Sequence, residues 1–97
     1  MAAYLVTSNE VFDRERYVAN YTKKGAAAVV QYGGRFLVEG GAPQIVEGNW
    51  CPQRMAVVEF PDRESALRFY HSPEYQEARQ ARLGLADFNM VIVETPN

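Results

Sequence analysis

The sequence has very few residues of the kinds that form disulfides or bind metals. It contains one cysteine, Cys51, and one histidine, His71. A single cysteine excludes an internal disulfide, and a histidine without a second histidine or cysteine nearby gives no pattern of metal ligands. No apolar run approaches the roughly 18 residues of a membrane-spanning helix, and no basic-then-apolar signal segment opens the chain. We therefore expect no metal, no membrane association and a cytoplasmic location.

A strong charge of either sign is also missing. Ten lysines and arginines nearly balance twelve aspartates and glutamates, for a net charge of −2. This balance gives no electrostatic reason to bind nucleic acid. The hydrophobic fraction of 47% is typical of a globular protein. With 97 residues the chain is expected to form one domain, 1–97, with a core small enough that an oligomer is a reasonable way to bury more surface.

Two short runs rich in strand-forming residues, Arg35–Glu39 and Met55–Phe60, dominate the middle of the chain. Glycine pairs flank the first run and a proline ends the second, as is typical of strand ends. Because side chains alternate across a strand, one face is expected to be wholly apolar, with Phe36, Val38, Ala56, Val58 and Phe60. The other face is mixed, with Arg35, Leu37, Glu39, Met55, Val57 and Glu59. An antiparallel pairing with Leu37 opposite Val57 places Arg35 opposite Glu59, and Glu39 opposite Met55.

The remaining elements follow from caps, turns and periodicity. Asp13 and Asp62 are good helix caps, Ser72-Pro73-Glu74 starts another helix, and Gly33 is a helix stop. The predicted strands lie at 2–8 and 89–94, with a turn at 9–13 and a short extra strand at 44–47. Three helices are predicted. The first lies at 14–32 and bends at Gly25, and the third runs from Ser72 to about Leu83. The second follows Asp62, and its buried stripe is formed by Ala66, Leu67, Phe69 and Tyr70.

The order strand, helix, strand, strand, helix, strand is that of the split βαβ, or ferredoxin-like, fold. The sequence therefore predicts an α+β protein with an antiparallel sheet and both helices on one face. The all-apolar strand face is expected beneath the helices. The opposite face still carries apolar residues, with Tyr4 and Val6 among them, and a face of this kind normally has a partner. We expect a homodimer that buries it.

Four ordered motifs resemble those of a known family. They are Tyr32–Val38 (YGGRFLV), Glu47–Trp50 (EGNW), Glu59–Pro61 (EFP) and Ser72–Gln76 (SPEYQ). Together they are similar to the DUF1330 family over nearly the whole chain. The resemblance implies a ferredoxin-like domain of the dimeric α+β barrel type. It implies no function, because the family is uncharacterised. Related dimeric barrels include small monooxygenases, haem-degrading enzymes and decarboxylating or isomerising proteins.

The first candidate site is the predicted pair of Arg35 and Glu59, with Tyr4 nearby. An arginine offers a fixed fork of donors to a planar anion, so this group would suit a small acid or carbonyl compound. The alternative is that the two charges form a cross-strand ion pair at a dimer interface. Ion pairs with a structural role occupy such positions too, and we favour this alternative.

The other candidates are single side chains. His71 would be a general base, or a surface residue near a helix end. One histidine suffices to hold haem in some proteins, so the sequence leaves haem open as a cofactor, but we predict none. Trp50 would cover a cavity or lie in an interface, and Cys51 is expected to be inert.

Two groups of residues are expected to have no chemical role. Most tyrosines are expected in the core with their hydroxyls directed outward. Arg79 and Arg82, with Glu74 and Glu77, are expected on a solvated helix face.

Two functions are compatible with these residues. The first is a homodimer that either binds a small molecule or acts as a cofactor-independent enzyme, with a pocket between sheet and helices or at the dimer cleft. Its polar groups would be Glu59, Arg35, Tyr4 and His71. The alternative is a structural or regulatory dimer without catalysis, whose polar groups serve strand pairing and assembly. The residue pattern does not choose between them.

Overall fold

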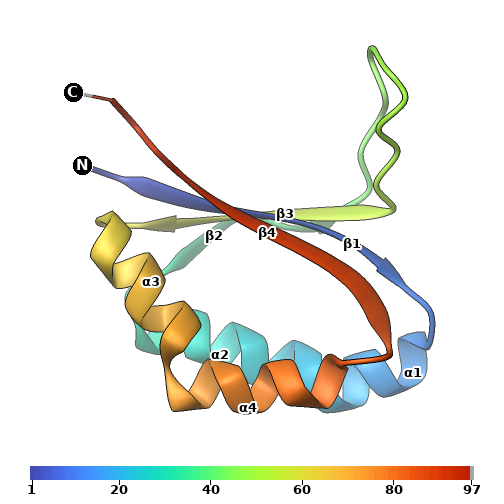
Figure 1. Ribbon diagram of the computed structural model, residues 1–97, viewed down its shortest axis with the longest axis horizontal. Helices are drawn as coiled ribbons and strands as arrows, with labels where there is room; N and C mark the ends of the chain where they lie inside the picture. Colours follow the sequence, from blue (N-terminus) through green and yellow to red (C-terminus); the bar gives the residue numbers. More distant parts are fainter. Residues whose placement is uncertain (97) are drawn as a thin grey trace.

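The computed structural model describes residues 1–96 and shows one sheet covered by one layer of helices (Figure 1). The elements along the chain are β1 (Ala3–Val11), α1 (Arg14–Tyr17), the π-helical turn η1 (Val18–Thr22), α2 (Lys23–Gln31), β2 (Arg35–Gly41), β3 (Arg54–Phe60), α3 (Arg63–His71), α4 (Pro73–Arg82) and β4 (Ala86–Glu94). Since α1, η1 and α2 follow one another without a break, the order is that of the split βαβ fold. The predicted ferredoxin-like architecture is confirmed.

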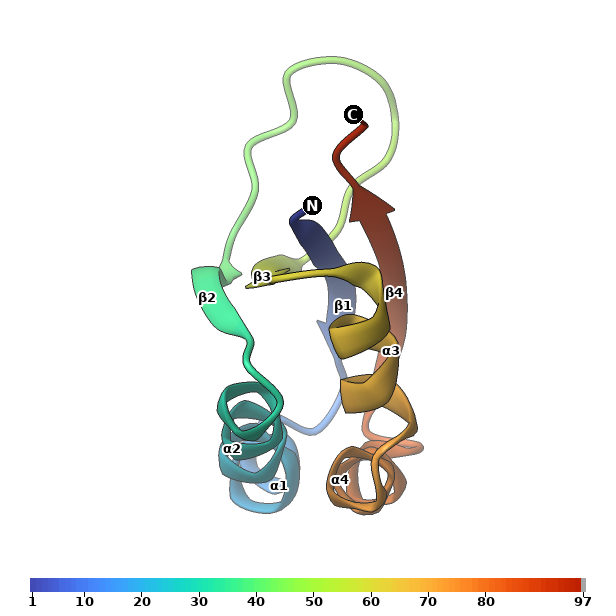
Figure 2. The same cartoon turned by 90° about the vertical axis from the view of Figure 1, so that its left-hand side faces the viewer.

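The sheet has four strands in the order β2-β3-β1-β4, and every neighbouring pair is antiparallel. All helices lie on one face, with α2 and α4 side by side along its length (Figure 2). We call this face of the sheet the inner face and the opposite one the outer face. Within residues 1–96 no helix covers the outer face (Figure 1).

The first helical segment begins and ends where the sequence predicts. The Asp13 carboxylate accepts a hydrogen bond from the backbone N–H of Arg16. Gly33 stops the helix with a φ of 86°, a conformation that costs glycine little. The irregularity lies in the π-helical turn η1, just before the predicted bend at Gly25. A Cβ atom on Gly25 would lie 3.0 Å from the ring of Tyr21, so the glycine leaves room for that ring against the helix.

The caps of the last two helices are also confirmed. The Asp62 carboxylate accepts from the backbone N–H of Ser65 at 2.7 Å. The Ser72 hydroxyl accepts from the backbone N–H of Tyr75 at 3.0 Å, with Pro73 at the first position of α4. These local signals separate α3 from α4 and turn the chain between them.

The pairing of β2 with β3 agrees with the prediction at one end and departs from it further along. Arg35 lies opposite Glu59, as expected. Val57 lies opposite Val38, however, and not opposite Leu37, because the register shifts along β2. A bulge adds one residue to one strand and moves the following side chains to the other face. The prediction that Val38 belongs to the inner face is therefore wrong, and its side chain is exposed.

A second shift in β2 places Gly41, and not Glu39, opposite Met55. The register predicted for this end of the pair is therefore wrong as well. Glycine at 40, with a φ of 75°, allows the backbone to turn here in a way that other residues resist.

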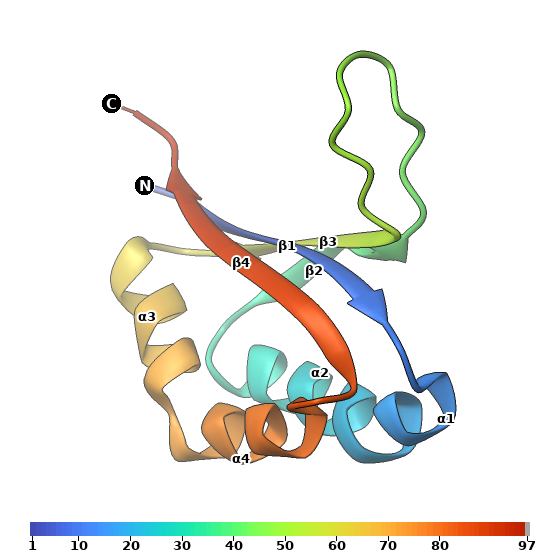
Figure 3. The same ribbon diagram turned by 45° about the vertical axis from the view of Figure 1, so that its right-hand side comes forward.

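Three element boundaries also differ from the prediction. The strand β1 continues through Asn9 to Val11, so most of the predicted turn at 9–13 is strand paired with β4. Strand β4 begins at Ala86, earlier than expected. Residues 44–47 form no strand. They belong to a long connection at 42–53, the arm, which projects from the outer face (Figures 1 and 3).

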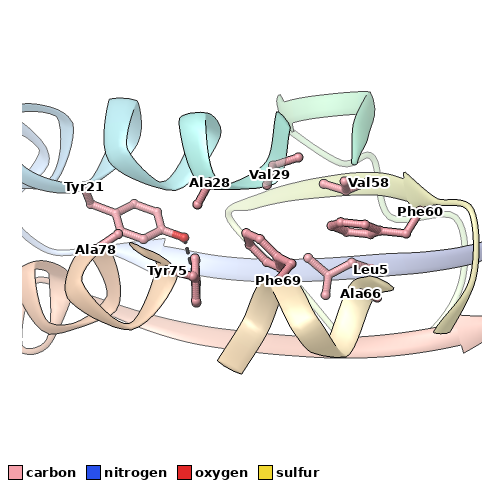
Figure 4. Close-up of a cluster of buried hydrophobic side chains, with 10 residues drawn as sticks. All are labelled: Leu5, Tyr21, Ala28, Val29, Val58, Phe60, Ala66, Phe69, Tyr75 and Ala78. Carbon is pink, nitrogen blue, oxygen red and sulfur yellow. Dashed lines mark hydrogen bonds between the residues drawn. The ribbon is translucent and has the colours of Figure 1, made fainter. Parts of the chain in front are cut away.

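The core lies between the inner face and the helices (Figure 4). Its largest fully buried side chains come from strands and helices alike and are Leu5, Val58, Phe60, Phe69 and Tyr75. In the predicted stripe of α3, Ala66 and Phe69 are buried, whereas Leu67 is 38% exposed. Close packing extends to the backbone at Gly34, where a Cβ would lie 2.7 Å from Val29 and 2.8 Å from Phe60.

Candidate functional site

A cavity of about 210 Å³ lies between the inner face and the helical segment α1–η1–α2. Its walls are mainly apolar, with Leu5, Phe36 and Val58 from the sheet and Val29 from α2. A cavity of roughly 150 Å³ with apolar walls can hold benzene. This cavity therefore has room for a compound of one or two rings, and it is the best-formed candidate for a binding site.

A few polar side chains converge on this apolar space. Asn9 and Thr7 reach it from β1, and Tyr17 and Tyr21 reach it from the helical segment. The Oδ1 atom of Asn9 is buried and has no hydrogen-bond donor among the described residues. A buried carbonyl oxygen without a donor is uncommon and costs about 1–3 kcal/mol.

One hydrogen-bonded chain crosses from the cavity into the helical layer. The hydroxyls of Tyr21 and Tyr75 lie 2.9 Å apart (Figure 4), and Arg82 Nη2 donates to the Tyr75 hydroxyl at 3.2 Å. The prediction that tyrosine hydroxyls point outward is wrong for these two. The prediction of a solvated Arg82 is wrong too, because only 7% of this residue is exposed.

Aromatic rings take the place of water around the buried guanidinium. The Arg82 Cζ atom lies 3.9 Å from the centroid of the Phe88 ring and 5.4 Å from that of Tyr21. The faces of aromatic rings attract cations, and guanidinium is weakly hydrated for a charged group. These contacts explain how α4 can bury a charge without a carboxylate partner.

Burial also fixes the protonation of the cavity tyrosines. Desolvation raises the pKa of Tyr17 to about 12, against the opposing effect of Arg82. Desolvation likewise raises the pKa of Tyr21 far above its ordinary value, and the neighbouring Tyr75 adds to the shift. Both side chains are therefore neutral phenols at physiological pH, and each carries a proton that it can donate.

The residues singled out from the sequence lie elsewhere. Arg35 Nη2 and Glu59 Oε1 form the predicted ion pair at 2.6 Å, with the arginine side chain 71% exposed. The strand register places Tyr4 opposite Glu59 on the neighbouring strand. None of the three lines the cavity. A ligand-binding role for them stays a prediction, and the exposed pair fits the architectural alternative.

The remaining candidates are also outside the cavity. His71 is exposed at the last position of α3, with its ring at an angle to that of Tyr70. Trp50 is 65% exposed in the arm, and Cys51 beside it is an exposed free thiol. Their roles stay predictions. No histidine or cysteine lines the cavity, so a haem ligated by either side chain does not fit there.

Two further properties bear on the kind of site. Residues 1–96 contain no group of three or more histidine, cysteine, aspartate or glutamate side chains placed to hold a metal ion. Across the same residues, no helix is both long and apolar enough to cross a membrane.

The sequence contained only a weak signal of this site. Tyr17 and Tyr21 are one helical turn apart, and Gly25 follows one turn later, where it leaves room for the tyrosine ring. Asn9 lies in a segment with turn-like composition, and Arg82 lies among charged residues. Neither position differs in sequence from an ordinary exposed one.

Several solved structures are similar to this chain. It is similar to RPA0582 from Rhodopseudomonas palustris, a protein of unknown function, at 13% identity and a TM-score of 0.78, over 99% of this chain and 83% of that one. It is similar to SnoaB from Streptomyces nogalater, a cofactor-independent oxygenase, at 13% identity and a TM-score of 0.69, over 99% and 94% of the two chains.

A third similar structure is a dimeric protein of unknown function with a ferredoxin-like fold from Bacteroides fragilis. Its identity is 14% and its TM-score 0.64, over 97% of this chain and 96% of that one. At such identities the likeness concerns the fold alone. No curated protein matches the chain. The family model for a domain of unknown function, DUF1330, matches residues 2–96, and the chain therefore belongs to the DUF1330 family.

Proposed function

We propose that this protein binds a small, largely apolar compound in the cavity between the inner face and α1–η1–α2. The observation that carries the proposal is the combination of about 210 Å³ of space with a buried, unpartnered acceptor at Asn9. Apolar walls with a few convergent polar groups are typical of small-molecule sites.

The test is to fill the cavity from the side of α2. Ala26 lines the cavity, whereas its neighbour Ala27 is exposed and does not. The change Ala26→Phe should therefore abolish binding, and Ala27→Phe should leave it unchanged. Binding of 2-naphthol and of naphthalene, two-ring probes of suitable size, is measured by their fluorescence. Failure of the unaltered protein to bind either probe, or equal binding by both variants, would refute a ligand site in this cavity.

A reaction on the bound compound is a second candidate, supported by the shared fold with a cofactor-independent oxygenase. With molecular oxygen as co-reactant, a CH₂ group beside a ketone would become a second carbonyl, and the other oxygen atom would leave as water. The probe is 2-tetralone, a two-ring enolisable ketone. Oxygen uptake should rise with the protein and not with Ala26→Phe. Equal uptake with and without the protein argues against oxygenation of such ketones.

We infer that the protein forms a homodimer through the outer face. Apolar side chains are exposed there on both edge strands, at Leu37, Val38, Val91 and Val93. The arm projects from the same face (Figure 3), with the large exposed side chains of Ile45, Val46 and Trp50. A second copy seated on the face would meet both surfaces. The dimeric ferredoxin-like protein of similar structure supports this arrangement.

Light scattering at micromolar concentration tests the dimer. We expect a mass of twice 11.0 kDa for the unaltered chain. The change Val91→Lys places a charge on the outer face and should yield monomers. The control Val30→Lys alters a valine that is more exposed, at 69%, but lies on α2. A monomeric mass for the unaltered chain would refute the dimer.

A further inference from the structure

The two tyrosines next to the buried Arg82 hold one more hydroxyl proton than their shared hydrogen bond uses. Arginine only donates, so the Tyr75 hydroxyl accepts from Arg82 Nη2. The two tyrosine hydroxyls share a single hydrogen bond of 2.9 Å, and either can be its donor. Two phenols carry two protons, and this bond uses one. Among residues 1–96 neither hydroxyl has a further acceptor, so one O–H is left to donate.

The two tyrosines that hold this spare O–H both contribute to the wall of the cavity, Tyr21 from the helical segment and Tyr75 from α4. A donor that is buried without an acceptor is costly, in the same way as an acceptor without a donor. A ligand oxygen in the cavity would supply the missing acceptor.

The charge of Arg82 sets which oxygen suits this donor best. The guanidinium is buried, and among residues 1–96 it makes no ion pair with a carboxylate. Through its bond to Tyr75 it polarises the tyrosine pair, and bonds assisted by a charge are shorter and stronger than neutral ones. An oxygen that carries partial or full negative charge therefore gains most at this position.

The unpartnered acceptor lies close to the same group of rings. The register of β1 and β4 places Asn9 directly opposite Phe88, the residue whose ring covers Arg82. The Phe88 ring also contacts Tyr21, with 5.9 Å between centroids. The cavity thus offers a tyrosine donor and the Asn9 Oδ1 acceptor around one aromatic ring.

We propose that the ligand of this cavity is a phenol or an enol on a one- or two-ring skeleton, whose oxygen accepts the spare tyrosine proton and whose own O–H donates to Asn9. Such a compound supplies an acceptor for the spare tyrosine O–H and a donor for Asn9 Oδ1 with one functional group, and it leaves the buried Arg82 Nε, which also lacks a partner, unchanged. This inference rests on the proposed function of the cavity and adds the chemical class of its ligand.

Three probes with the same two-ring skeleton separate the two contacts. Naphthalene makes neither, 2-methoxynaphthalene can only accept, and 2-naphthol can accept and donate. Each additional hydrogen bond is expected to raise affinity roughly three- to tenfold. The unaltered protein should therefore bind 2-naphthol more tightly than 2-methoxynaphthalene, and 2-methoxynaphthalene more tightly than naphthalene.

The variants assign each contact to its residue. The double change Tyr21→Phe with Tyr75→Phe removes the donor and should make the ether and naphthalene equal. Either change alone leaves one tyrosine proton free, so it should retain most of the preference. Asn9→Leu should make 2-naphthol and the ether equal. The control Tyr70→Phe removes a tyrosine hydroxyl outside the cavity and should change nothing.

The outcomes also separate this inference from the function on which it rests. Equal affinity of the unaltered protein for all three probes, with Ala26→Phe still abolishing binding, would overturn the ligand class and keep the cavity as a binding site. Preferences that survive both the double tyrosine change and Asn9→Leu would overturn the assignment to these residues. Circular dichroism of each variant confirms that it is folded before affinities are compared.

Discussion

The backbone lies close to the core at Gly34, just before β2, so Gly34→Ala is a sharp test of the packing. The new Cβ would lie 2.7 Å from Val29 Cγ1 and 2.8 Å from Phe60 Cζ. Carbon atoms prefer about 3.5–4.0 Å, so the methyl group is short of space by roughly 0.8 Å. Val29 and Phe60 are 3% and 0% exposed, so neither side chain can swing into solvent.

The expected loss of stability follows from two opposing effects. Overpacking a core costs about 1–3 kcal/mol. Replacing glycine by alanine also restricts the unfolded chain, which offsets about 0.4–1 kcal/mol. The net change in the free energy of unfolding for Gly34→Ala is therefore about 1–2 kcal/mol of destabilisation. For a domain of this size that lowers Tm by roughly 5–15 °C.

Urea unfolding and calorimetry measure the change, and a double-mutant cycle locates its origin. Val29→Ala removes the methyl group that the new Cβ would meet, so Gly34→Ala should cost less in that background, with a coupling of at least about 0.5 kcal/mol. An unchanged Tm for Gly34→Ala, or full additivity of the two changes, would show that the core yields at this point and that the packing argument is wrong.

Two further predictions concern charged and titrating groups. The changes Arg35→Met and Glu59→Gln should each alter the free energy of unfolding by less than about 1 kcal/mol, because the arginine side chain of this ion pair is largely exposed. Neither change should affect probe binding in the cavity. A loss of probe binding in either variant would contradict this prediction. Alkaline unfolding should depend on Tyr17, whose pKa is raised to about 12 by burial. Below about pH 10 the folded and unfolded forms are both protonated, and above it the unfolded form releases its proton first. Stability should therefore fall between about pH 10 and 12, by at most about 1.4 kcal/mol per pH unit for this group, less the effect of its partial exposure. Between about pH 10 and 12 the Tm of Tyr17→Phe should fall less steeply with pH than the Tm of the unaltered protein. The same slope for both proteins would count against the burial of the Tyr17 phenol.

Local signals were enough to predict most of the fold. Asp13, Asp62 and Ser72 cap helices as expected, and Gly33 ends one. Caps and glycine turns depend on a few neighbouring residues, so they can be recognised in a single sequence. The pairing of Arg35 with Glu59 across β2 and β3 was also predicted correctly, because Arg35 directly follows the glycine pair that fixes where β2 begins.

The errors arise where distant segments decide the outcome. The extension of β1 through Asn9 depends on pairing with β4, almost at the other end of the described chain. The bulge in β2 moves Val38 to the outer face without any special residue at that position. Arg82 is buried because the Phe88 ring, on another element, covers its charge. Each of these features depends on tertiary packing and produces no recognisable pattern among neighbouring residues in the sequence.

The candidate site was the least predictable part for the same reason. Its donor and acceptor come from β1, η1 and α4, which are far apart in the sequence. Arginine, asparagine and tyrosine are common on surfaces, and only their burial together makes them unusual. The pair that the sequence did bring together, Arg35 and Glu59, lies outside the cavity.

The position of β1 in the sheet has a consequence for how the chain folds during its synthesis. This strand lies between β3 and β4, so its backbone is fully paired only when the last strand joins. During synthesis β1 leaves the ribosome first and β4 last. In the meantime one edge of β1 is open to pairing with other chains, a known route to aggregation. Slow synthesis, or truncation before β4, should therefore yield insoluble protein, whereas shortening the arm should have no such effect.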